Sequence, residues 1–161
     1  MTIAEGDKLP EATFRALGPD GIQTLSTKDV FGGKKVVLFA VPGAFTPTCH
    51  LKHLPGFIEG ADAIKAKGVD DVICVAVNDP FVLAAWGEAT GAAGKVKILS
   101  DGNAEFTKAI GMDFDGSGIG LGIRSKRYAM VVEDGTVKVL NTEENPGVAE
   151  VSDAESILAA L

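Results

Sequence analysis

Two seven-residue runs constrain the fold of this chain most, KVVLFAV at 35–41 and DVICVAV at 71–77. Beyond its first residue, each run is apolar at successive positions, so both faces of the strand need apolar cover. Strands of this kind lie at the centre of a sheet that helices cover. Helical patterns follow both runs, at about 48–67 and at 80–90. An α/β architecture is therefore predicted.

Hairpins are predicted on either side of this centre. ATFRAL and IQTLS flank the turn signal Gly18-Pro19-Asp20-Gly21, and residues 127–141 hold two β-rich runs around Asp134-Gly135. The remaining expected elements are a short helix closed by Gly32-Gly33, a kink at Pro55, a strand at 96–99, a short helix ending at Gly111 and a last helix capped by Ser152 and Glu155. This order predicts a thioredoxin-like α/β fold, with a mixed central sheet, helices on both faces and an N-terminal β-hairpin.

Length and charge narrow the classes of protein. The 161 residues suit one domain, 1–161, which buries roughly 70% of the surface of the unfolded chain. A net charge of −7 argues against nucleic acid and anionic membranes as partners, and the basic cluster at 124–127 is too short to reverse this. The N-terminus resembles no signal peptide, no apolar run is long enough to span a membrane, and two cysteines make no disulfide scaffold. The expected location is a reducing cytoplasm.

One of the two cysteines lies where a strand has just ended, in VPGAFTPTCH at 41–50. Thr46 can cap a helix, Pro47 suits its first position, and Cys49 then falls in the first turn. Unpaired backbone N–H groups and the helix dipole there favour a thiolate over a thiol. The strand's carboxyl end is also where open α/β sheets form clefts. This position favours a reactive thiol over an inert buried cysteine.

Other thiol chemistries fit the chain less well. A Cys-His protease would have to take its base from His50 or His53. His50, next to Cys49 on a helix, is expected to project away from the sulfur, and His53 is expected on the helix surface or at a dimer interface. Thioredoxin-type disulfide exchange needs a C-x-x-C motif, and none begins at Cys49. A zinc site could be formed from Cys49, His53 and Cys74, but these residues lack the closely spaced ligand pairs of zinc-binding motifs. The glycine-rich segment 116–122 matches neither the dinucleotide-binding motif G-x-G-x-x-G nor the phosphate-binding P-loop, and it is interpreted as a mobile loop. Cys74, inside an apolar strand, is expected to be a small buried hydrophobe.

Four segments carry a family resemblance. Pro42, Thr46 and Cys49, spaced P-x-x-x-T-x-x-C, resemble the active-site motif of the peroxiredoxins. HLPGF, VNDPFVLAAWG and RYAMVVEDGTV follow in the order found in the type II, peroxiredoxin-5-like subfamily. The resemblance covers essentially the whole chain.

The resemblance implies a role for each matching residue. Cys49 becomes the nucleophile that attacks the peroxide O–O bond, and its backbone helps to bind the substrate. Thr46 supplies a hydroxyl to the thiolate and the peroxide, and Pro42 shields the sulfur from water. The family arginine precedes an aromatic residue on a later strand, which indicates Arg127; Arg124 is the second candidate. Without the resemblance, Arg127 would be interpreted as a solvated charge on an edge strand. A hydroxyl and a guanidinium aimed at the breaking bond would stabilise the charge that develops on oxygen.

The implied activity is reduction of hydrogen peroxide and alkyl hydroperoxides by a homodimer, without metal, haem or flavin. Some type II relatives carry a resolving cysteine near the C-terminus, but residues 141–161 contain none. The expected reductant of the Cys49 sulfenic acid is therefore an external thiol, either glutathione with glutaredoxin or thioredoxin, and Cys74 is not expected to take part. The alternative from another class is a redox sensor or chaperone-like protein whose thiol does not turn over.

Overall fold

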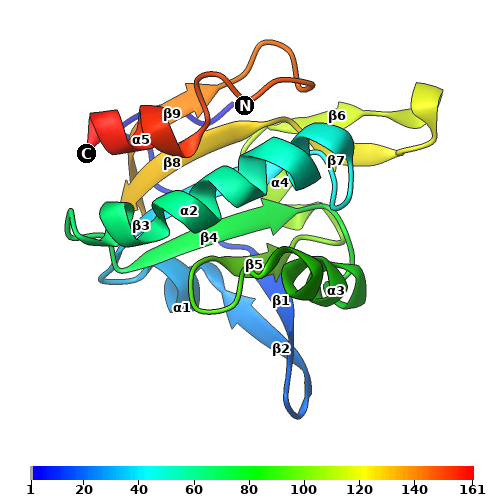
Figure 1. Cartoon of the computed structure of the whole chain (residues 1–161), viewed down its shortest axis with the longest axis horizontal. Coiled ribbons are helices and arrows are strands. Elements are labelled where there is room, and N and C mark those ends of the chain that lie inside the picture. Colours follow the sequence, from blue (N-terminus) through cyan, green and yellow to red (C-terminus); the bar gives the residue numbers. More distant parts are fainter. Residues whose placement is uncertain (1) are drawn as a thin grey trace.

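The computed structural model describes residues 2–161 and contains a seven-stranded mixed sheet in the order β2-β1-β5-β4-β3-β8-β9 (Figure 1). The pairs β3–β4 and β4–β5 are parallel, and the others are antiparallel. The strands are β1 (Thr13–Gly18), β2 (Gly21–Ser26), β3 (Lys35–Val41), β4 (Asp71–Ala76), β5 (Lys97–Ser100), β8 (Tyr128–Glu133) and β9 (Thr136–Thr142). The mixed sheet and the N-terminal hairpin are confirmed.

Helices cover both faces of the sheet because the central strands are apolar on both. In β3, Val36 and Leu38 join one core cluster, and Val37 and Phe39 join the other. The first cluster lies under α1 (Thr27–Phe31) and α4 (Glu105–Ala109). The second lies under α2 (Leu54–Lys65), α3 (Pro80–Thr90) and α5 (Ala154–Ala160). Among residues 2–161, no helix is both long enough and apolar enough to span a bilayer.

The glycine-rich segment is not simply a loop. It joins β6 (Asp113–Asp115) to β7 (Ile123–Ser125) through a short 3₁₀ helix, η2 (Ser117–Ile119). This two-stranded ribbon extends away from the main sheet in Figure 1. The sequence does not reveal the ribbon because strands of three residues are too short to show an alternating pattern.

The helix that carries the first cysteine differs from the expected one. It begins at Pro47, and a π-helical segment, η1 (Cys49–His53), leads into α2, which ends at Lys65. Within η1 the Leu54 N–H donates to the Cys49 carbonyl oxygen, five residues back. Pro55 has no N–H to continue regular α-helical bonding, so the irregular turn lies just before it. This wider turn around the cysteine is a feature that the sequence did not predict, and the kink expected at Pro55 stays a prediction.

The expected cap of the last helix is wrong by one residue. Asp153 caps α5 by accepting from the Ser156 N–H at 2.9 Å. Ser152 lies just before it and is wholly buried, where its hydroxyl donates to Glu143 at 2.6 Å. A buried hydroxyl needs a partner, and the tertiary structure offers one that the local sequence does not reveal.

Candidate active site

Cys49 lies at the start of the helix that follows β3, as its position in the sequence predicts. It is the third helical residue, so its N–H has no acceptor within the helix. The side chain is completely buried in the core cluster beneath α2 and α3. A buried sulfur at this position is shielded from water but lies beside the positive end of the helix.

Arg127 lies against this sulfur although 78 residues separate it from Cys49. It immediately precedes β8, which pairs with β3, and this pairing brings it to the carboxyl end of β3. Its Nη2 donates to Cys49 Sγ at 2.9 Å, and the side chain is only 2% exposed. A guanidinium stays charged at physiological pH and so favours the thiolate at this distance. The interpretation of Arg127 as a solvated edge charge, which fits its sequence position alone, is wrong.

His53 joins the site, which the sequence does not predict. Its side chain is buried rather than on the helix surface, and its ring contacts Phe39 at a centroid distance of 4.9 Å. Nε2 donates to the Ser152 carbonyl oxygen at 2.8 Å, so Nδ1 is free to accept from Arg127 Nη1, also at 2.8 Å. The neutral ring therefore orients the guanidinium that contacts Cys49.

The surroundings of His53 keep it neutral. Burial lowers the pKa of His53 from 6.5 to about 4; the Ser152 carbonyl opposes this shift, and the charge of Arg127 adds to it. In the unfolded chain the imidazole takes up a proton as the pH falls below 6.5, whereas the folded protein takes it up only near pH 4. Stability from this group is thus complete above pH 6.5 and is lost between about 6.5 and about 4.

We therefore expect the free energy of unfolding to be about 2 kcal/mol lower at pH 5 than at pH 7, because of His53. Urea unfolding at the two pH values measures this difference. The His53→Gln variant, whose amide can both donate and accept, should lose most of the pH dependence. His50→Gln is the matched control and should keep it. An equal pH dependence in wild type and His53→Gln would contradict the prediction.

Pro42 and Thr46 line a mostly apolar hollow of about 280 Å³ that reaches Arg127. The Thr46 hydroxyl donates to the Gly43 carbonyl oxygen at 2.6 Å and does not cap the helix as expected. A hydroxyl has one proton to donate, so in this arrangement its oxygen remains an acceptor toward the hollow. The other lining residues are Pro47, Thr48, Phe114, Ile119, Leu121, Pro146 and Gly147.

Arg124, the second candidate arginine, lies outside the contact with the sulfur. Its Nη1 donates to the Pro42 carbonyl oxygen at 3.2 Å, and its Nε donates to the Leu121 carbonyl oxygen at 2.9 Å. It therefore ties the β6–β7 ribbon to the loop that precedes Cys49. Its role in the structure is to brace this loop.

Cys74 lies in β4 opposite Phe39 of β3, in the same core cluster as Cys49. Both cysteines are free thiols and both are buried. Burial raises the pKa of the Cys74 thiol well above its ordinary value, and the neighbouring charge of Cys49 raises it further. Cys74 is therefore a poor nucleophile in the folded protein.

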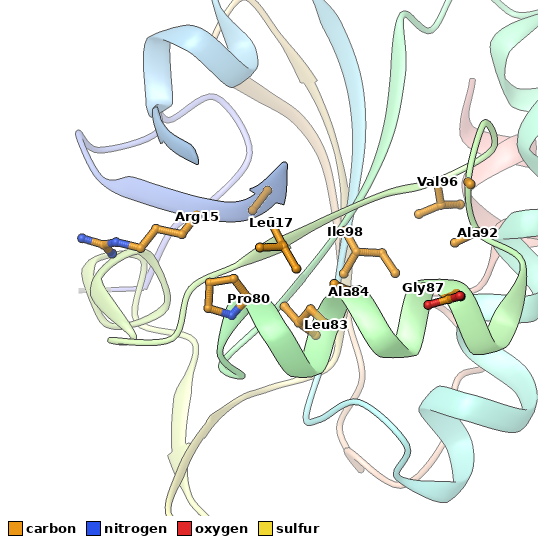
Figure 2. Close-up of a pocket in the computed structure, with 12 residues that line it drawn as sticks. Arg15, Leu17, Pro80, Leu83, Ala84, Gly87, Ala92, Val96 and Ile98 are labelled. Atoms are coloured by element: carbon orange, nitrogen blue, oxygen red, sulfur yellow. The ribbon is translucent and has the colours of Figure 1, made fainter. Parts of the chain in front are cut away.

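A second hollow, of about 330 Å³, lies between β1, α3 and β5 (Figure 2), and its lining offers no thiol that could act as a nucleophile. No cysteine, histidine or hydroxyl side chain lines it; most of its wall is apolar, with Arg15 and Glu88 as its charged residues. Within residues 2–161, no three or more His, Cys, Asp or Glu side chains are grouped to hold a metal ion. The other lining residues are Ala16, Leu17, Pro80, Leu83, Ala84, Gly87, Ala92, Ala93, Val96 and Ile98.

A cysteine held against a guanidinium at the carboxyl end of a central strand of a thioredoxin-like sheet is the arrangement of a thiol-dependent redox enzyme. The family described as Redoxin matches residues 4–158. Peroxiredoxin-2E-2, chloroplastic, of Oryza sativa subsp. japonica is 54% identical over 99% of this chain and 73% of its own length. Peroxiredoxin-2B of Arabidopsis thaliana is 48% identical over 99% of this chain and 98% of its own length. The chain belongs to the peroxiredoxins, in their type II subfamily, and is a thiol-dependent peroxidase.

Solved structures agree with this assignment. Reduced Prx3 from Vibrio vulnificus, in complex with hydrogen peroxide, matches with a TM-score of 0.94 and 53% sequence identity, and covers 99% of each chain. The predicted thioredoxin-like fold and peroxiredoxin activity are thus both confirmed. The enzyme uses a peroxide as its oxidising substrate and a thiol as its reductant.

Proposed function

We propose that Cys49 is the nucleophile of this peroxidase and that Arg127, Thr46 and Pro42 complete its active site. The observation that carries the proposal is the 2.9 Å contact from Arg127 Nη2 to Cys49 Sγ inside the protein. The thiolate attacks one peroxide oxygen, the S–O bond forms, and the O–O bond breaks. Cys49 is oxidised to a sulfenic acid, and the leaving oxygen takes a proton to become water or an alcohol.

The hollow beside Arg127 is the proposed entry for hydrogen peroxide and alkyl hydroperoxides. The peroxide O–H would donate to the Thr46 oxygen, since that hydroxyl already donates to Gly43. The Cys49 N–H and the Arg127 guanidinium would stabilise the charge on the departing oxygen. Pro42 lines the same hollow and keeps water from the sulfur. The solved relative bound to hydrogen peroxide supports the same substrate here.

The proposed cycle uses one cysteine. Cys74 is buried with its pKa raised, so it is not expected to attack the sulfenic acid. An external thiol, glutathione or thioredoxin, would instead form a mixed disulfide with Cys49 and release water. A second thiol, such as glutaredoxin, would then free the enzyme. Because Cys49 is wholly buried, the first turn of its helix must open for this exchange.

Mass spectrometry after one equivalent of peroxide tests this cycle. With glutathione present, both wild type and Cys74→Ser should carry a glutathione adduct on Cys49. Without glutathione, both should show the added oxygen of a sulfenic acid or its over-oxidised products. Loss of two hydrogens in wild type, absent from Cys74→Ser, would instead reveal an internal disulfide and overturn the one-cysteine cycle.

A homodimer is also proposed, joined near the active-site loops. Phe45, Leu51 and Phe81 are 50%, 74% and 60% exposed, which is unusual for large apolar side chains. The Ala44 N–H donates to Asn78 Oδ1 at 2.9 Å, which places the loops of Phe45 and Phe81 side by side. Analytical ultracentrifugation should show a dimer that Phe81→Glu weakens. Monomer alone across a wide concentration range would remove this proposal.

The proposed location is the cytoplasm, where thiols stay reduced, which suits two free cysteines. Relatives named chloroplastic and mitochondrial show that chains of this kind work in several compartments. Fractionation of the source cells with an antibody to the protein would settle the location. Recovery in an organelle fraction would contradict a cytoplasmic location.

A further inference from the structure

The segment that follows β9, residues 143–152, is folded around one carboxylate. Glu143 Oε2 accepts from the N–H groups of Glu150, Val151 and Ser152, at 2.9, 2.8 and 2.7 Å. It also accepts from the Ser152 hydroxyl at 2.6 Å. The Glu143 side chain forms no salt bridge within residues 2–161, so its partners are these donors of its own segment. The carboxylate therefore closes residues 143–152 into a loop.

These contacts hold Glu143 in its charged form. Burial raises the pKa of the carboxyl, but the Ser152 hydroxyl and the three backbone N–H groups together lower it below its usual range. Hydrogen bonds to an ionised acceptor are about twice as strong as those between neutral groups. The convergence of these donors on the ionised carboxylate keeps the loop closed.

The closed loop presents three carbonyl oxygens to the active site. The Pro146 carbonyl accepts from Arg127 Nε at 2.9 Å, and the Ser152 carbonyl accepts from His53 Nε2 at 2.8 Å. The Gly147 carbonyl accepts from the Thr48 hydroxyl at 2.6 Å, just before Cys49. The loop thus holds the arginine, the histidine that orients it, and the helix that carries the sulfur.

Arg127 depends on this loop for two of its three side-chain hydrogen bonds to protein. Nε is held by Pro146 directly, and Nη1 is held by His53, whose ring orientation is set by Ser152. The third donor, Nη2, is then left aimed at Cys49 Sγ. A planar guanidinium with two of its corners fixed has no freedom to turn the third away.

We propose that Glu143 is a positioning residue for the peroxidase reaction, which acts by closing the 143–152 loop that aims Arg127 at Cys49. This inference rests on the proposed role of Arg127. Without the negative charge, the three inward-facing N–H groups would have at most a neutral, weaker acceptor, and the loop would loosen. The Pro146 and Ser152 carbonyls would then move, and the guanidinium would lose its fixed direction. Small misplacements of this kind can slow a reaction by as much as about 10²-fold.

The test is the Glu143→Gln variant, which keeps the size of the side chain and removes its charge. Its second-order rate constant with hydrogen peroxide, measured by stopped flow, should fall about 10- to 100-fold. The ultraviolet absorbance of the Cys49 thiolate should also appear at higher pH than in wild type, because the guanidinium no longer holds the anion. Glu144→Gln, which removes the same charge from the next, exposed position, is the matched control and should change neither value.

A double-mutant cycle separates positioning from a general structural effect. In an Arg127→Ala background, Glu143→Gln should have almost no further effect on the rate constant, because the group that it positions is gone. Should Glu143→Gln not fold, Ser152→Ala is used instead, because it removes the hydroxyl that donates to Glu143 and so weakens the closure of the same loop. The rate constant and the thiolate absorbance are measured in the same way. A smaller fall in the rate constant and the same shift of the thiolate absorbance are then expected.

The inference is overturned by a Glu143→Gln enzyme with wild-type rate and thiolate titration, or by an equal loss in the Arg127→Ala background. An equal effect of Glu144→Gln would overturn it too, since only net charge would then matter. If Arg127→Ala itself leaves the rate unchanged, the proposed role of Arg127 fails. If Arg127→Ala slows the reaction and Glu143→Gln does not, only the positioning role of Glu143 fails.

Discussion

Replacing Cys49 by serine is expected to abolish peroxide consumption, with a fall of at least about 10⁴-fold in the rate constant. A serine hydroxyl is close in size but is not ionised at neutral pH, and ionised sulfur is the nucleophile that attacks peroxide. The fold should be retained, because the side chain is enclosed by the core cluster beneath α2 and α3 in either case. Stopped-flow measurement of peroxide loss with a thiol donor gives the rate.

Cys74→Ser is the matched control, because it makes the same atomic change in the same core cluster. It should keep most of the activity, since the hydrogen bond of Arg127 to sulfur goes to Cys49 and burial raises the pKa of Cys74. It should lower the free energy of unfolding, because a hydroxyl is then buried in an apolar strand without a hydrogen-bond partner. If the two variants lost activity equally, the assignment of Cys49 as the nucleophile would be refuted.

Arg127→Ala is expected to lower the rate constant for hydrogen peroxide by about 10²- to 10³-fold, the usual cost of removing one donor to a developing anion. The loss has two sources. The thiolate loses its 2.9 Å charged partner, so less of it is present at neutral pH. The transition state loses the guanidinium that would bind the departing oxygen. Rate profiles over pH separate the two, because only the first shifts along the pH axis.

Two further variants sharpen this prediction. Arg127→Lys should recover only part of the rate, because one ammonium cannot reach Pro146, His53 and Cys49 together. Arg124→Ala should cost far less, since its guanidinium binds the carbonyl oxygens of Pro42 and Leu121 and not the sulfur. A larger loss for Arg124→Ala than for Arg127→Ala would show that the wrong arginine has been assigned.

The sequence alone predicts the scaffold of this peroxidase and the place of its thiol. Apolar runs at 35–41 and 71–77 identify the central strands, because a strand buried on both faces has apolar residues at successive positions. The Asp-Gly at 134–135 marks the turn between β8 and β9. Thr46 and Pro47, just before Cys49, predict that the cysteine lies at the start of a helix. All of these signals are local, so each can be recognised within about ten residues.

The sequence could not predict what surrounds the thiol. Arg127 and Glu143 follow Cys49 by more than 75 residues, and neither has a local pattern that distinguishes it from a surface charge. Without the family motif, the sequence position of Arg127 indicates a solvated side chain, and that of His53 indicates the helix surface or a dimer interface. Both expectations failed because burial of a polar side chain depends on partners that only the folded chain supplies.

The tertiary structure decided these partners through two features of the sheet. Pairing of β8 with β3 carries Arg127 to the end of the strand that precedes Cys49. The loop after β9 then folds back onto the helix that carries Cys49, and its carbonyls accept hydrogen bonds from Arg127, His53 and Thr48. The sequence by itself determined an α/β sheet with a cysteine at the head of a helix. Only the long-range strand pairing and loop closure decided which charge lies beside that cysteine, because hydrogen bonds between distant segments exist only once those segments have packed.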